Sequence, residues 1–143
     1  MLVGLLSLLT AALFSGAAIY INFAEQPARL ELDDRSLLVQ WKRSYKRGFL
    51  MQAPLAVVGC LLGRASWCLT GQIGFVVGAL LMIANLPWTV FGVMPTNKIL
   101  MRTELAAAGR KSRALIVKWN VLHAVRSGLG ACATLAFLIA LST

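Results

Sequence analysis

The 143-residue sequence contains one histidine, five acidic residues and three cysteines, and these small numbers exclude several kinds of site. A single histidine cannot supply both axial ligands of a bis-histidine haem. The cysteines form no C-x-x-C pair, so the zinc and thioredoxin-like spacings are missing. No Walker sequence, dinucleotide fingerprint or serine elbow is present either. We therefore expect a protein without a metal ion or a bound cofactor.

Apolar residues make up 59% of the chain and charged residues only 13%, which is far more apolar than a soluble domain. A helix needs about 20 apolar residues to cross a bilayer, and four apolar runs approach or exceed that length. They cover about residues 2–23, 46–63, 67–94 and 119–141. We therefore predict a single membrane domain over residues 1–143, with the all-α fold of an integral membrane four-helix bundle.

The first run carries no basic residue before Arg29 and is long for the core of a signal peptide, so we expect a retained span. Pro87 lies in the last part of the third run and predicts a tilt or kink there. The two halves of the chain also resemble each other weakly, because each has a span, a proline turn, a basic helix and a second span. A duplicated helical hairpin is one interpretation of this pattern.

Small residues in the runs indicate close packing of helices. Gly74 and Gly78 form a G-x-x-x-G pair, and Gly59 and Gly63 have the same spacing. The cysteines are Cys60, Cys68 and Cys132, of which the first two flank a short loop and could form a disulfide. We favour their interpretation as small packing residues.

Basic residues give the chain a net charge of +9 and concentrate in two of the three predicted loops. Positive residues favour the cytoplasmic side, so we predict that both basic loops face the cytoplasm or an equivalent compartment, with both termini opposite. Because the charges flank apolar runs, lipid headgroups are the expected partners and nucleic acid is not. The first basic loop has Arg29, Arg35, Lys42, Arg43, Lys46 and Arg47, the middle loop only Arg64, and the last Lys98, Arg102, Arg110, Lys111, Arg113 and Lys118.

Both basic loops are expected to be partly helical. In the first, residues 37–47 have an apolar face that leads into the second span. In the second, a short helix is expected from about Lys98 to Ala108, ended by Gly109, before a long helix continues into the fourth span. The candidate N-caps are Asp33, Asp34 and Ser36 for the first helix and Ser112 for the last.

The strongest local signal for function is the segment W119-N-V-L-H-A-V-R-S-G128. Trp119, His123 and Arg126 are spaced i, i+4 and i+7, so a helix places them on one face. Ionisable groups at the edge of a bilayer are costly and tend to face a protein interior or a wet cavity. Taken singly, such residues could instead cap helix ends or reach lipid headgroups. The residues expected to complete one polar pocket at the same depth are Asn22, Glu25, Trp88 and Asn97.

Three segments resemble the anthrone oxygenase-like family of small four-span membrane proteins: E25-Q-P-A-R-L30, A84-N-L-P-W-T89 with P95-T-N-K-I-L100, and W119-N-V-L-H-A-V-R-S-G128. The resemblance covers nearly the whole chain, although much of this family is known only as a domain of unknown function. Gln26 is a departure, because some relatives have histidine at that place. The resemblance implies a cofactor-independent oxygenase that acts on hydrophobic polycyclic phenolics of the anthrone type.

An anthrone has a methylene between two aryl rings, and loss of its proton gives an anion that can pass an electron to oxygen without metal or flavin. The resemblance implies that His123 is the base and that Arg126 stabilises the enolate-like oxygen. The implied substrate-binding residues are Trp119 and Trp88 by stacking, Asn97 and Asn22 by orienting the reacting groups, and Glu25 as a neighbour in the pocket.

Two other functions remain open at this stage. The small size, the lack of cofactor motifs and the glycine-lined runs fit a non-catalytic accessory or assembly subunit, bound to membrane-protein partners or to copies of itself. The weak internal repeat would suit a small transporter, although no acidic residue lies well inside a run.

Overall fold

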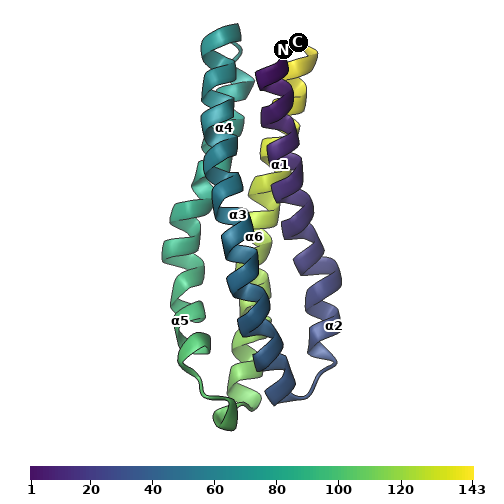
Figure 1. Ribbon diagram of the computed structural model, residues 1–143, viewed down its shortest axis with the longest axis vertical. Coiled ribbons are helices and arrows are strands. Elements are labelled where there is room, and N and C mark those ends of the chain that lie inside the picture. The colour runs from purple at the N-terminus through teal and green to yellow at the C-terminus, as the bar shows by residue number, and fades with distance from the viewer.

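The computed structural model describes all residues, 1–143, as helices joined by short connections (Figure 1). They form four continuous rods. The first is α1 (Leu2–Tyr20), the π-helical turn η1 (Ile21–Glu25) and α2 (Gln26–Leu30), and the second is α3 (Asp34–Thr70). The third is α4 (Ile73–Trp88), the π-helical turn η2 (Thr89–Val93) and α5 (Met94–Arg102). The short 3-10 turn η3 (Leu105–Ala107) leads to the fourth, α6 (Arg110–Ser142).

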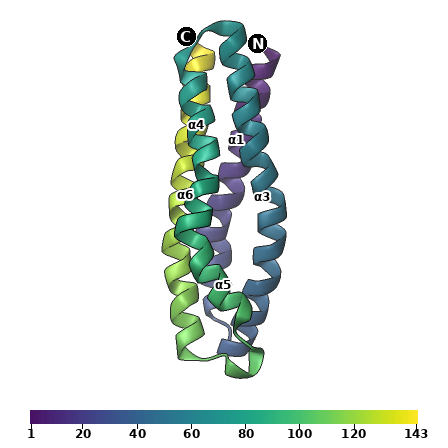
Figure 2. The ribbon, with the colours of Figure 1, turned by 90° about the vertical axis from the view of Figure 1, so that its left-hand side faces the viewer.

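The rods form an antiparallel bundle in which α1 and α4 each pack against both α3 and α6 (Figures 1 and 2). Both termini and the turn at residues 71–72 lie at one end of the bundle. The connections 31–33 and 103–109 lie at the opposite end, which we call the loop end. Such an up-down arrangement with short connections is typical of four-helix bundles.

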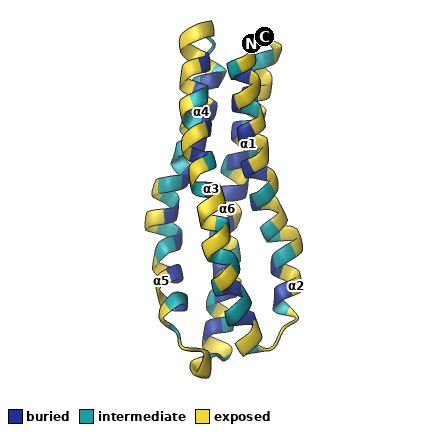
Figure 3. Cartoon of the chain, viewed as in Figure 1, coloured by how far each residue is buried: buried dark blue, intermediate teal, exposed yellow.

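The outer surface of the bundle is apolar along much of its length. Leu5, Leu61, Leu80 and Ile139 are among the exposed large side chains, and Figure 3 shows exposed positions along the outer faces. Each rod has 29 to 37 residues and is long and apolar enough to cross a membrane. Soluble monomers rarely expose so much contiguous apolar surface. The prediction of an all-α membrane four-helix bundle is therefore confirmed.

Both π-helical turns are followed by a proline at the second position of the next helix. Pro27 stands there in α2 and Pro95 in α5, six residues after the first residue of η1 and η2 respectively. Proline has no backbone N–H group to donate to the preceding turn, and in both rods this break in the α-helical pattern coincides with a π-helical turn through which the helix continues. Figure 1 shows α2 and α5 diverging to either side of α3 and α6 below these turns. A second buried apolar cluster, which includes Trp41 and Trp119, fills the bundle between them.

The predicted helix ends in the basic segments are partly wrong. Asp33 is the N-cap of α3, as predicted, and hydrogen bonding from Ser36 lowers the pKa of its carboxyl group. The helix expected to reach Ala108 ends instead at Arg102, because Thr103 adopts an extended conformation. Ser112 is not the cap of α6. The helix begins at Arg110, and the Ser112 hydroxyl accepts a hydrogen bond from the backbone N–H of Gly109.

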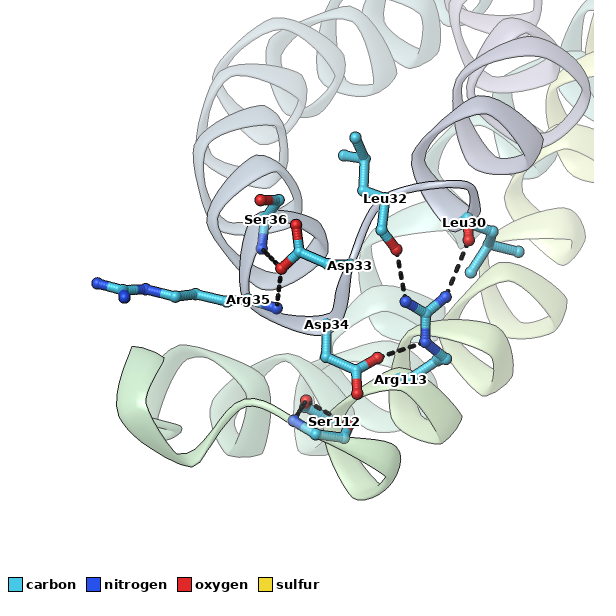
Figure 4. A network of polar contacts seen from close by, with 9 residues as sticks. Leu30, Leu32, Asp33, Asp34, Arg35, Ser36, Ser112 and Arg113 are labelled. Atoms are coloured by element: carbon cyan, nitrogen blue, oxygen red, sulfur yellow. Dashed lines mark hydrogen bonds and ion pairs between the residues drawn. The ribbon is translucent and has the colours of Figure 1, made fainter.

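Arg113, near the start of α6, contacts the end of α2, the connection 31–33 and the start of α3 (Figure 4). Its guanidinium pairs with Asp34 and donates hydrogen bonds to the carbonyl oxygens of Leu30 and Leu32. These carbonyls belong to the end of α2 and the residues after it, where a helix has no partners of its own. Arg113 therefore fixes the position of α2 against α3 and α6.

The glycines predicted to pack helices closely do so. A Cβ atom at Gly63 or Gly78 would overlap the ring of Phe137, which is fully buried. A Cβ atom at Gly74 would lie 2.9 Å from that of Ala140 and 3.2 Å from the backbone oxygen of Ala136. Glycine at residues 74 and 78 lets α4 approach α6 closely, and Gly63 does the same for α3. The three cysteines are free.

Candidate functional site

Buried polar side chains of all four rods surround a small cavity in the half of the bundle nearest the loop end. Its volume is about 20 Å³, enough for roughly one water molecule. It lies between the apolar layer around Phe14 and Phe137 and the layer around Trp41 and Trp119. Its polar and aromatic lining comprises Arg29, Ser44, Tyr45, Phe49, Gln52, Asn97, Trp119, His123 and Arg126.

A hydrogen-bond network orients the His123 ring. The Asn22 side chain donates through Nδ2 to the backbone oxygen and to Oδ1 of Asn120, so its own Oδ1 is an acceptor. The Ser127 hydroxyl donates to that Oδ1 at 2.6 Å, and His123 Nδ1 lies 2.9 Å from it. His123 Nδ1 must therefore carry a proton, and in the neutral ring Nε2 keeps the free lone pair. In the neutral ring Nε2 is therefore the nitrogen that can accept a proton.

Trp119 provides an aromatic surface beside this histidine. The two rings are stacked with their centroids 4.8 Å apart and an interplanar angle of 28°. The guanidinium carbon of Arg29 lies 5.7 Å from the Trp119 ring centroid, within the range of a cation–π contact. Trp41 packs edge-on against the same indole. Trp119 is thereby held rigidly at the cavity wall.

Two buried arginines make the cavity strongly cationic, and their environments differ. Arg29 forms an ion pair with Glu25 and donates to the Ser44 hydroxyl at 3.2 Å. Arg126 is only 8% exposed, yet no acidic residue pairs with it and its Nε atom has no hydrogen-bond partner. Its guanidinium carbon lies instead 5.6 Å from the Phe14 ring centroid. A buried charge without a counter-ion is costly, so this position favours an anionic ligand.

Two amides in the cavity wall also lack partners. Gln52 and Asn97 are each 1% exposed, and neither the oxygen nor the nitrogen of either amide is hydrogen-bonded. Buried polar groups are nearly always satisfied by protein or by bound water. Four unpartnered amide atoms beside Arg126 therefore indicate a space that receives a polar molecule.

The structure brings most of the predicted pocket residues together, but two of them lie elsewhere. The residues that line the cavity are Trp119, His123, Arg126 and Asn97. Asn22 does not line it but accepts a hydrogen bond from His123 Nδ1. The Trp88 indole donates to the Leu122 carbonyl oxygen and lines a separate apolar groove between the third rod and α6. Glu25 lines the neighbouring groove between the first rod and α3, where it pairs with Arg29 and accepts a hydrogen bond from Gln40. Gln26 is buried and donates to the Ile116 carbonyl oxygen without lining the cavity.

Arg29, Tyr45 and Gln52 are cavity residues that sequence reasoning did not single out. The sequence places Arg29 at the end of the first span and in the first basic loop, and Pro27 interrupts the helical geometry expected there. The chain stays helical through Pro27, and this places Arg29 one turn after Glu25 and inside the bundle. The i, i+4 spacing of an acidic and a basic residue was the available signal.

Known proteins provide independent information on the chain. The family model described as "Anthrone oxygenase" matches residues 41–136. The chain is 31% identical over 131 residues to the anthrone oxygenase tpcL of Aspergillus fumigatus, covering 85% of this chain and 81% of that protein. It is 27% identical over 142 residues to the anthrone oxygenase AgnL2 of Paecilomyces divaricatus, covering 85% and 84%. An anthrone oxygenase of Claviceps purpurea is 31% identical over 134 residues, covering 83% and 74%. No solved structure shows significant similarity.

Proposed function

Because the chain belongs to the anthrone oxygenase family, we propose that it oxidises the methylene of a hydrophobic anthrone-type phenol with molecular oxygen. One observation supports this most directly: His123 is oriented as a base beside Arg126, a buried cation without a counter-ion. The pair suits a reaction in which a neutral substrate loses a proton and becomes an anion. Trp119 offers a flat surface for an aromatic ring at the same place.

The first step is removal of the methylene proton. The carbon lies between two aryl rings and opposite a ketone, so the charge left by the proton spreads to the ketone oxygen. His123 accepts this proton at Nε2, while its Nδ1 proton stays in the hydrogen bond to Asn22. Positioned general bases typically contribute about 10²- to 10⁴-fold to a rate.

The second step is stabilisation of the anion. Arg126 and Arg29 place two guanidinium groups at the cavity wall, and Arg126 has no competing carboxylate. In a site without bulk water such fixed charges act strongly on developing negative charge. The amides of Gln52 and Asn97 add donors and acceptors for phenolic oxygens.

The third step is the reaction with oxygen. The anion transfers one electron to O2, and the resulting substrate radical combines with superoxide to form a C–O bond at the former methylene. The peroxide takes up the proton held by His123, loses the second hydrogen of that carbon, and its O–O bond breaks to leave a second ketone and water. The sum is one anthrone and one O2 converted into one anthraquinone and one water.

Purified protein in detergent should convert an added anthrone into the quinone faster than protein-free micelles, by about tenfold or more. Absorbance of the quinone and an oxygen electrode should report equal amounts of quinone formed and oxygen consumed. A rate equal to that of empty micelles would overturn the proposal. Hydrogen peroxide released in step with the quinone would contradict the oxygen chemistry.

The accessory-subunit alternative is not favoured, because the relatives that cover most of the chain carry the name of an oxygenase. The cavity also has features that a packing interface does not need, namely unpartnered amides and an unpaired buried cation. We therefore retain the enzymatic proposal for this site.

We also propose that residues 1–143 act as one membrane domain whose loop end faces the cytoplasm or an equivalent compartment. The support is the concentration of basic residues near that end. Cys68 is exposed close to the turn at residues 71–72, at the opposite end. A membrane-impermeant maleimide should label Cys68 only from the non-cytoplasmic side, and Cys68→Ser should abolish that labelling. Labelling from the cytoplasmic side would reverse the orientation.

A further inference from the structure

A groove on the outer face of the bundle lies directly beside the cavity. It runs between the first rod and α3 and has a volume of about 710 Å³. That volume falls within the roughly 300–1,000 Å³ of typical ligand pockets, whereas the cavity at His123 is far below it. Ile21, Ser44 and Gly48 border both spaces. A single layer of residues therefore separates a ligand-sized space from the proposed base.

This layer is thin at Gly48. A Cβ atom there would approach only Ile21, whose Cδ1 would be 3.9 Å away. Ile21 is half-buried and is the first residue of the π-helical turn η1, a kind of turn that is often found at functional sites. Rotation of the Ile21 side chain, opposite a residue without a side chain, would join the groove to the cavity.

The groove also has a charged part and an apolar part. Arg35, Arg43 and Arg47 line it towards the loop end, and none of them forms an ion pair. Tyr20 and Met51 line it further from that end. Glu25 also lines it, paired with Arg29. A phenol on a fused-ring body combines an oxygen-bearing edge that can accept hydrogen bonds from arginine with a flat apolar face, so it matches both parts.

We infer that this groove is the entrance through which a phenolic anthrone passes from the bilayer to His123, with Gly48 and Ile21 as its gate. The inference rests on the proposed function for the identity of the ligand. Arg43 and Arg47 donate hydrogen bonds to the phenolic oxygen while the central ring moves past Gly48 towards the cavity. Opening of the gate supplies the room that the closed cavity lacks.

The other groove large enough for such a ligand does not offer this route. It has a volume of about 570 Å³, includes Trp88, Phe91 and Val125, and lies between the third rod and α6. It shares no lining residue with the cavity and has no charged side chain. A ligand bound there would remain separated from His123.

The test measures the binding of a dihydroxyanthraquinone by quenching of tryptophan fluorescence. This compound has no methylene carbon, so the enzyme cannot oxidise it by the proposed reaction. Gly48→Phe should slow association about tenfold or more, whereas Gly48→Ala should have little effect because its methyl group fits. Ile21→Ala should accelerate association a few-fold. Gly128→Phe is the matched control, because Gly128 is exposed on α6 with no atom within 4 Å of an added Cβ.

If the folded Gly48→Phe variant binds the quinone as fast as the wild type, the inference is overturned. It is also overturned if the wild-type protein shows no quenching. If Gly48→Phe fails to fold, unchanged association in Ile21→Ala overturns it equally. Arg43→Gln with Arg47→Gln should weaken binding of the phenolic quinone but not of unsubstituted anthraquinone. Equal weakening of both would contradict the role of the arginines. If the variants change the association rate as expected but the wild-type protein does not turn over an anthrone, the proposed oxidation is rejected and the entrance is still supported.

Discussion

Replacing His123 by asparagine is expected to lower the rate of quinone formation by about 10²- to 10⁴-fold while the bundle stays folded. The amide nitrogen of asparagine can occupy the place of Nδ1 and donate to Asn22, so the network with Ser127 survives. Asparagine cannot accept a proton near neutral pH, and the methylene carbon then keeps its hydrogen. Initial rates at saturating oxygen, measured by absorbance of the quinone, give the size of the effect.

A structural role and a catalytic role of His123 make different predictions about pH. An anthrone that ionises in solution no longer needs a base in the protein. The difference in the rate of quinone formation between His123→Asn and wild type should therefore become smaller as the pH rises past the pH at which the substrate itself ionises. A constant deficit at every pH would assign His123 to packing against Trp119, and an unchanged rate at neutral pH would remove it from the mechanism.

The four spans and the site face of α6 could be predicted because each depends on local periodicity. Trp119, His123 and Arg126 lie on an uninterrupted helix, so their i, i+4, i+7 spacing translates directly into one face. Asn22 and Arg29 also stand seven residues apart, and both face the site.

The placement of Trp88 shows where prediction from the sequence stopped. Trp88 and Asn97 were expected at similar depth near the end of the third span, but they are nine residues apart, about 13 Å along a helix, and the π-helical turn η2 lies between them. Both residues had been assigned to one polar pocket only because of this expected depth in the membrane. The closure of the cavity was also beyond the sequence, because it depends on how Ile21, Ser44 and Phe49 from two rods fit together. Periodicity along one helix contains no information on that contact.

Replacing Arg126 by methionine is expected to lower the turnover rate by about 10²- to 10³-fold, the usual cost of losing one group that stabilises an oxyanion. The same change should not destabilise the protein. Arg126 is buried without a carboxylate partner, so an apolar side chain of similar length removes a desolvated charge and should raise the free energy of unfolding by about 1 kcal/mol or more. Turnover and thermal unfolding in the same detergent measure the two effects.

Arg29→Met is the control for the two effects expected of Arg126→Met, a lower turnover rate and a higher free energy of unfolding. Arg29 is equally buried, but it pairs with the partly exposed Glu25 and donates to Ser44, so Arg29→Met leaves a carboxylate and a hydroxyl without this partner. That variant should lose stability, by about 1 kcal/mol or more, because one member of a partly buried pair is removed. A protein in which Arg126 only anchors α6 would lose stability in both variants. Lower turnover with equal or higher stability in Arg126→Met, beside a destabilised Arg29→Met, would mean that Arg126 is kept for an anion that the chain itself does not contain.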